Sequence, residues 1–223
     1  MSAHEGHGVT TMAMIQNSIA EMMPSEMREA YASLSDDVIH LHRKWKVIRE
    51  LYVSGETVIE LLNRTAPGFF RICKDVLVDD LFLGIRRLTD PKQTGKKQNL
   101  TLEYLADSID AAKYPELRSK VERLLLECGG KCGFAREHSN KRIAHNDLPT
   151  KLQVESLSEP TTTHVKDALQ SVRALMNEIE KHFLPSAYCN DVNIAFVDYS
   201  GVVTVDAFKL LSCLRELEAS KHV

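Results

Sequence analysis

The chain has 223 residues, 43% hydrophobic and 26% charged, which suits one globular unit with its own core and argues against a disordered or fibrous chain. Its formal net charge of −3 excludes a global field that would draw the protein onto nucleic acid or an anionic membrane, so any RNA binding has to be local. No apolar stretch is long enough to span a bilayer and the first residues do not resemble a signal peptide, which predicts a cytoplasmic protein without a membrane partner.

An N-terminal arm and one long helix are predicted at the start of the chain. Residues 1–24 mix methionine, histidine, glycine and threonine, a composition typical of a mobile arm. Between Ser25 and Tyr52 apolar residues recur at the spacing of one helix face, which predicts a long amphipathic helix. A shorter helical pattern follows at residues 56–65.

The most apolar helical pattern of the chain covers residues 69–88. We expect it to be the central helix of a bundle, closed by Asp90 and Pro91. The residues expected to fill the centre of that bundle are Phe69, Cys73, Val76, Leu77, Phe82 and Ile85. The polar residues 91–99 that follow are predicted to form a loop.

Two further helical segments are predicted in the middle of the chain. A short helix is expected near Thr101, and Pro115 stands where a longer one would begin, because proline is favoured in the first helical turn. Gly129 and Gly130 are expected to interrupt or kink this helix, and the helical pattern resumes over residues 134–144.

The C-terminal part combines helices with the most credible strand segment of the sequence. A long helix is predicted for residues 163–183, and residues 193–204 suggest a small hairpin before another helix from Asp206. The sequence therefore predicts a mainly α fold, a helical bundle over residues 25–185 with a hairpin-plus-helix appendage over residues 186–223.

The cysteines do not suggest a disulfide framework. The five residues are Cys73, Cys128, Cys132, Cys189 and Cys213, an odd and scattered set that is expected to stay reduced. Cys128 and Cys132, with His138 nearby, have two interpretations: a zinc site, or small apolar residues on a helix face. No second pair follows at zinc-finger spacing, so neither a metal nor a cofactor is predicted.

The densest cluster of ionisable and amide side chains lies between Arg136 and Asp147, with the sequence REHSNKRIAHND. On a helix, Lys141 would share a face with His145, and His138 would share a face with Arg142, giving a cationic face with two imidazoles that can hold a phosphate.

This cluster has a catalytic and a structural interpretation. Cleaving RNA without a metal needs a base for the 2′-hydroxyl, an acid for the leaving oxygen and a fixed cation for the phosphorane, which histidine and arginine can supply. Alternatively, His145 ends its helix favourably as a cation near the C-terminal carbonyls, and Asn146 begins a turn. Spacing alone leaves both interpretations open.

A second polar cluster stands at the end of the central helix. Arg86, Arg87 and Asp90 can form an ion-paired helix end in which Asp90 bonds backbone amides before the turn. In the functional interpretation the two arginines instead face a cleft and hold RNA phosphates.

Three separated segments resemble one known family. The sequence NKRIAHNDL, from Asn140 to Leu148, is similar to the signature of HEPN proteins, specifically their abortive-infection (Abi U-type) branch. The other segments are Leu61 to Asn63 with Phe69 and Phe70, and Arg86 to Pro91 followed by Asn99 to Leu102. Their order and spacing agree with that branch over most of the chain.

The resemblance implies a helical bundle that forms a homodimer and brings two copies of the motif into one cleft. It implies an RNA-binding protein of prokaryotic defence or toxin–antitoxin systems, acting as a metal-independent endoribonuclease, with an antitoxin or an enzyme as a further partner. His145 would then be the general acid or base, Arg136 or Arg142 would supply charge, and Asn140 would orient a phosphate or the imidazole.

The resemblance also assigns RNA contacts and shows one departure from the family pattern. Arg86, Arg87, Lys141 and Asn146 are the expected RNA-binding residues. Directly before Asn140, where active HEPN ribonucleases carry their catalytic arginine, this chain has Ser139. A serine hydroxyl does not replace the forked permanent charge of a guanidinium.

This departure gives a second hypothesis, a non-catalytic dimeric interaction module with a degenerate motif. A Ser139→Arg change is expected to separate the two hypotheses by restoring cleavage. A third hypothesis, nucleotidyl modification of an exposed tyrosine such as Tyr104 or Tyr114 by a partner enzyme, follows from family analogy alone.

Overall fold

The computed structural model describes residues 20–144, 152, 160–184 and 206–220. The helices are α2 (Ser25–Tyr52), α3 (Glu56–Thr65), α4 (Pro67–Thr89), α5 (Leu102–Asp107), α6 (Pro115–Lys131), α7 (Gly133–His138), the π-helix η1 (Ser139–Ala144), α9 (Thr162–Phe183) and α11 (Asp206–Ser220). The strands are β1 (Gln93–Thr94) and β2 (Lys97–Gln98). The mainly α class and the helical bundle predicted from the sequence are confirmed.

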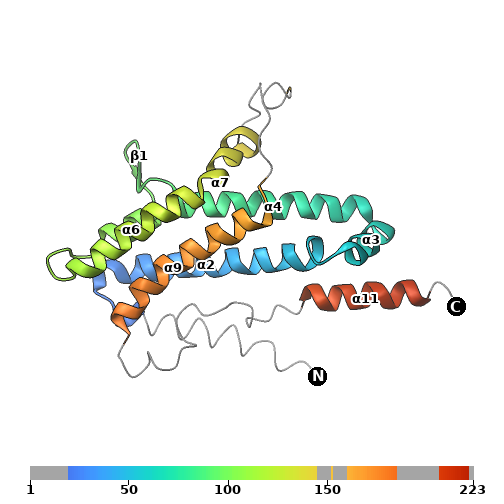
Figure 1. Ribbon diagram of the computed structural model, residues 1–223, viewed down its shortest axis with the longest axis horizontal. Helices are drawn as coiled ribbons and strands as arrows, with labels where there is room; N and C mark the ends of the chain where they lie inside the picture. Colours follow the sequence, from blue (N-terminus) through green and yellow to red (C-terminus); the bar gives the residue numbers. More distant parts are fainter. Residues whose placement is uncertain (1–19, 145–151, 153–159, 185–205, 221–223) are drawn as a thin grey trace.

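Two pairs of long helices form the bundle. Figure 1 shows α2 and α4 lying side by side along the long axis, while α6 and α9 form a second pair that crosses them. Helix α7 rises from the end of α6 and packs on α4, and α11 lies against α2 and α3. None of the described helices combines the length and apolar character needed to cross a membrane.

The main core is built where the apolar stripes of these helices meet. Its largest fully buried side chains include Tyr31 and Leu34 of α2, Ile85 and Leu88 of α4, Leu102 and Leu105 of α5, Leu117 of α6, and Leu169 and Leu175 of α9. Burying one such aliphatic side chain contributes about 1.5–3 kcal/mol, so these stripes determine the bundle. Ala20 and Met23, just before α2, are also buried in this core.

Helix α4 is less completely buried than the sequence predicted. Phe82 and Ile85 are buried as expected, but Phe69 and Val76 are 62% and 61% exposed. The prediction that these two fill the bundle centre is therefore wrong. The reason is that the N-terminal half of α4 packs through its other face, where Phe70 contacts a smaller core shared with α3 and α11.

A small antiparallel hairpin occupies the segment predicted to be a loop. Gln93 pairs with Gln98 and Thr94 with Lys97, and Gly95 takes a φ of 59° that favours glycine in such a turn. Each strand has two residues, which is too short for an alternating pattern of apolar and polar residues to reveal it in the sequence. The hairpin expected at residues 193–204 lies outside the described residues.

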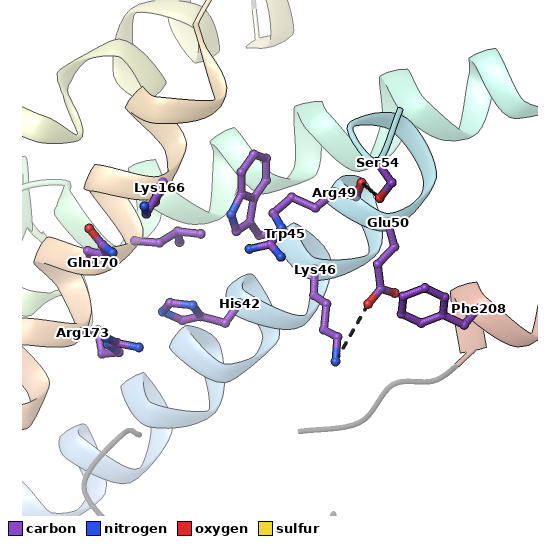
Figure 2. Close-up of a pocket in the computed structure, with 11 residues that line it drawn as sticks. His42, Trp45, Lys46, Arg49, Glu50, Ser54, Lys166, Gln170, Arg173 and Phe208 are labelled. Atoms are coloured by element: carbon purple, nitrogen blue, oxygen red, sulfur yellow. Dashed lines mark hydrogen bonds and ion pairs between the residues drawn. The ribbon is translucent and has the colours of Figure 1, made fainter. Parts of the chain in front are cut away.

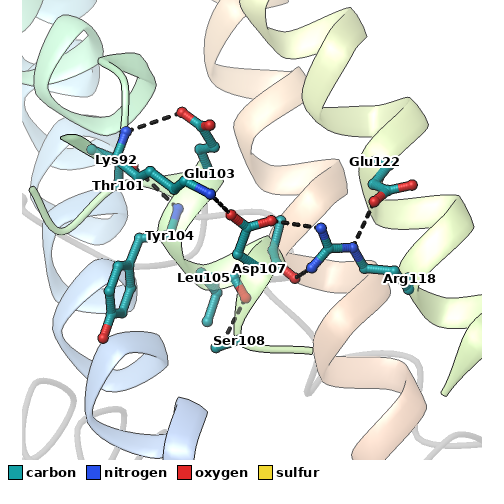
Figure 3. Close-up of polar contacts among 10 residues, drawn as sticks. Lys92, Thr101, Glu103, Tyr104, Leu105, Asp107, Ser108, Arg118 and Glu122 are labelled. Atoms are coloured by element: carbon teal, nitrogen blue, oxygen red, sulfur yellow. Dashed lines mark hydrogen bonds and ion pairs between the residues drawn. The ribbon is translucent and has the colours of Figure 1, made fainter. Parts of the chain in front are cut away.

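Charged side chains fasten this hairpin segment to α5 and α6. Figure 3 shows Asp107 between Lys92, with which it forms an ion pair, and Arg118, whose Nη2 donates to it at 2.5 Å. Arg118 also donates through Nη1 to the carbonyl of Ala106 at 2.6 Å and through Nε to Glu122 at 2.6 Å. The hydrogen bond from Lys92 is the main cause that lowers the pKa of the Asp107 carboxyl.

The glycine pair in α6 does not interrupt the helix as predicted. Helix α6 continues through Gly129 and Gly130, and the Cys132 N–H still donates to the carbonyl of Cys128 at 2.9 Å. The break comes at Cys132, after which α7 begins at Gly133. The mild propensity penalty of glycine is therefore outweighed by packing against α9.

The close approach of α2 and α4 gives a test of the bundle. A Cβ on Gly84 would overlap the buried Leu41 side chain, so Gly84→Ala is expected to lower the free energy of unfolding by about 1–2 kcal/mol. In the matched variant Gly130→Ala the new methyl meets no atom within 4 Å, and we expect a gain of up to about 1 kcal/mol. Chemical denaturation measures the free energy of unfolding of both variants. An equal increase in the two would contradict the close approach of α2 and α4.

Candidate functional site

Helix α7 and the π-helix η1 carry residues 136–144 of the ionisable cluster predicted from the sequence. Both pack against α4, so one helix supports the described part of the cluster, residues 136–144. In η1 the hydrogen bonds run to the fifth residue rather than the fourth, an arrangement that is rare and found frequently at functional sites. The chain therefore departs from α-helical geometry at the residues expected to be functional.

Arg136 connects the two polar clusters that the sequence treats separately. Its Nη2 donates to the carbonyl of Thr89 at 2.6 Å and lies 3.6 Å from the Asp90 carboxylate. The other carboxylate oxygen of Asp90 lies 3.4 Å from Nε of Arg86. Asp90 thus forms ion pairs with Arg86 and Arg136, so that the end of α4 and the motif become one surface.

Arg142 forms a second link to α4. Its Nη2 makes an ion pair with the carboxylate of Asp79, which lies one turn beyond Val76 on α4. Lys141 pairs instead with Glu137 of the preceding turn at 3.3 Å. Because Asp79 stands 63 residues before Arg142, no local sequence pattern could have identified this pair.

The prediction that His138 shares a cationic face with Arg142 is wrong. This side chain is 1% exposed, and its ring packs edge-on against Phe82 at 5.4 Å, whereas Arg142 is exposed. Phe134 contacts the same Phe82 ring at 5.4 Å, so His138 belongs to the apolar seam that joins α7 to α4. His138 is therefore a packing residue.

Ser139 is also buried. The side chain has no exposed surface, and its hydroxyl donates to the carbonyl of Ala135 at 2.6 Å, one turn earlier. At the position where the family pattern places its arginine, this chain thus directs a small side chain inward. The cations near this position are Arg136, Lys141 and Arg142.

The remaining predicted site residues differ in how the structure places them. Asn140 is exposed, and so is Arg87, which makes no ion pair with any carboxylate among the described residues. The positions of His145 and Asn146 lie outside the described residues.

The site as described is cationic overall. Five cations, Arg86, Arg87, Arg136, Lys141 and Arg142, stand beside three carboxylates, Asp79, Asp90 and Glu137. The paired side chains are partly exposed, and exposed ion pairs contribute only about 0–1 kcal/mol each. A phosphate can therefore take the place of a carboxylate as their partner with little loss of stability.

The cysteine pair beside the motif is a packing feature. Cys128 and Cys132 are both buried, with their sulfur atoms 3.8 Å apart. Their mutual hydrogen bond and burial raise the pKa of the Cys132 thiol. Within the described ranges no group of three or more histidine, cysteine and acidic residues is arranged to hold a metal ion.

A comparison with protein families identifies the family of this chain. The sequence model of AbiU2, a HEPN family, matches residues 25–194, from the first residue of α2 to beyond the end of α9. No curated protein and no solved structure matches the chain. The AbiU2 match spans the whole helical bundle together with α7 and η1, far more than half of the sequence, and the chain therefore belongs to the HEPN proteins of the AbiU2 type.

Proposed function

We propose that this abortive-infection-type HEPN protein is a cytoplasmic homodimer that binds RNA at the cationic surface of α4, α7 and η1 and cleaves it without a metal. The observation that carries the proposal is the joining of Arg86, Arg136 and Arg142 on one surface. Guanidinium groups offer phosphate a fixed, forked set of donors. In the same proposal, an antitoxin or a partner enzyme controls the activity.

In this proposal each side chain has a distinct role. His145 transfers the proton to or from the reacting oxygen, and Arg136 or Arg142 stabilises the charge on the phosphorane. Asn140 orients the phosphate or the imidazole, while Arg87 and Lys141, together with Asn146, bind the flanking RNA. The exposure of Asn140 and Arg87 supports these assignments.

Cleavage is tested by removing the imidazole. With total RNA and a chelator present, we expect His145→Ala to reduce cleavage by about 100-fold or more, because a positioned general acid or base contributes about 10²–10⁴-fold. The matched control is His40→Ala, an exposed histidine of α2, which should retain the wild-type rate. Equal degradation by wild-type protein and His145→Ala would remove the catalytic claim.

Dimerisation is supported by the exposed stripe of α4. Phe69, Ile72 and Val76 are more than 60% exposed and recur at intervals of three and four residues, which puts them on one helix face. The next turn carries Asp79, the partner of Arg142. A second copy packed on this stripe would bring its motif close to the first.

Charges in the stripe test the dimer. Ile72→Glu with Val76→Glu is expected to weaken self-association at least tenfold, because the interface would bury two unpaired carboxylates. Leu126→Glu on α6 is the matched control, since Leu126 is an 81% exposed leucine away from α4. Sedimentation velocity gives the oligomeric state, and an unchanged dimer in the double variant would exclude this stripe as the interface.

The burial of Ser139 favours a second candidate function, a non-catalytic dimeric interaction module. In this alternative the cationic surface binds RNA or a protein partner without cleavage, since the arginine of active family members is replaced. RNA binding that depends on Arg142 but proceeds without cleavage would support it.

The same burial changes what a Ser139→Arg variant can reveal. Because Ser139 has no exposed surface, the new guanidinium would enter the seam between α7 and α4 and is expected to lower the unfolding free energy by about 3 kcal/mol or more. Asn140→Arg, at the exposed neighbouring position, should change it by less than about 0.5 kcal/mol. Thermal melting compares the two. Restored cleavage with an unchanged melting temperature would contradict the inward position of Ser139.

A further inference from the structure

A second cationic region lies between α2 and α9, away from the motif. It surrounds a groove of about 680 Å³, and Figure 2 shows its side chains converging from the two helices, with Phe208 of α11 at one side. The cations are Lys46 and Arg49 of α2 and Lys166 and Arg173 of α9. Trp45 lines the groove among them. Sequence reasoning missed this region because its residues come from helices more than one hundred positions apart.

Among the described residues, three of these four cations form no ion pair with a carboxylate. Lys46 lies 3.9 Å from Glu50, the one carboxylate on the described lining. Arg49, Lys166 and Arg173 make no ion pair with carboxylates of the described chain, although the whole sequence is net acidic. Like charges gathered without partners destabilise a fold, so their convergence points to an anionic ligand that the groove accommodates.

The positive charge of the groove also affects His42. Burial first, and then the charge of Arg173, lower the pKa of its imidazole to about 4. The ring is therefore neutral near pH 7 and adds no further positive charge. Between the cations, the amide of Gln170 supplies a hydrogen-bonding group.

The groove continues toward the helix that carries the motif. An adjoining hollow of about 350 Å³ shares Trp45, Arg49 and Lys166 and reaches Thr162 and Thr163 at the start of α9. The next residue, His164, stacks on Phe134 of α7 at 6.1 Å. From Arg173 to Thr162 the lining covers about 16 Å along α9, more than one nucleotide requires.

We propose that this groove binds a short stretch of single-stranded RNA, with backbone phosphates on Arg49, Lys166 and Arg173 and a base against Trp45. Cations that follow a strand combined with an aromatic side chain are the usual means of binding single-stranded nucleic acid. This inference deepens the proposed function, on which it rests for the class of ligand. The groove would hold a part of the strand that lies outside the reacting phosphodiester.

The sequence provides a local reporter, because Trp45 is the single tryptophan of the chain. In the His145→Ala protein, which keeps the RNA intact, a ten-nucleotide oligouridylate is expected to quench tryptophan fluorescence on binding. Lys166→Glu with Arg173→Glu should weaken this binding at least tenfold and reduce its salt dependence, because two phosphate contacts are lost. Lys166→Glu alone should show a smaller loss, which guards against misfolding of the double variant.

The matched control makes the same change in charge elsewhere. Lys97→Glu with Arg123→Glu alters two exposed cations on the hairpin and on α6 and should leave the quenching isotherm unchanged. Fluorescence anisotropy of labelled RNA measures total binding in parallel.

Three results would overturn the groove assignment. If anisotropy detects RNA binding but the fluorescence of Trp45 is not quenched, the RNA binds elsewhere. If that binding depends on Arg142 alone, the proposed function stays intact. Equal weakening by the groove and control variants would indicate unspecific attraction. Quenching by uridine monophosphate or inorganic phosphate at the same concentration as by the oligomer would indicate a small-anion site. Conversely, groove-dependent quenching without RNA cleavage would support the groove while removing the catalytic claim.

Discussion

The attachment of α7 and η1 to α4 is the interaction on which the rest of the site depends. An apolar seam of Phe82, Phe134 and His138 holds the two segments together. The ion pairs of Arg136 with Asp90 and of Arg142 with Asp79 flank this seam. Without this attachment the arginines at the end of α4 and those of the motif would not share a surface.

Burial decides which side chains of the motif can meet a ligand. His138 and Ser139 lie inside and Asn140 lies outside, so three consecutive residues divide between packing and exposure. Ser139 additionally bonds to the preceding turn, which ties the start of η1 to α7. Ser139, at the position where the resemblance places an arginine, therefore faces inward.

Much of the fold could be predicted from the sequence, but the composition of the site could be predicted only in part. The bounds of α2 were predicted correctly, because the spacing of apolar residues along a helix is a local property of the sequence. The exposure of Phe69 and Val76 could not be predicted, because periodicity identifies an apolar stripe without saying what covers it. The partner of Arg142 and the α2–α9 groove depend on tertiary packing between distant segments.

The two kinds of contact at the site have different consequences for function. Ion pairs on the surface contribute little to stability, so Arg136 and Arg142 can exchange a carboxylate for a phosphate while the bundle stays intact. Replacing the buried contacts of His138 would instead leave a cavity against Phe82 and loosen the whole motif. The exposed arginines can therefore be replaced with little effect on the bundle, whereas a change at the seam also alters its stability.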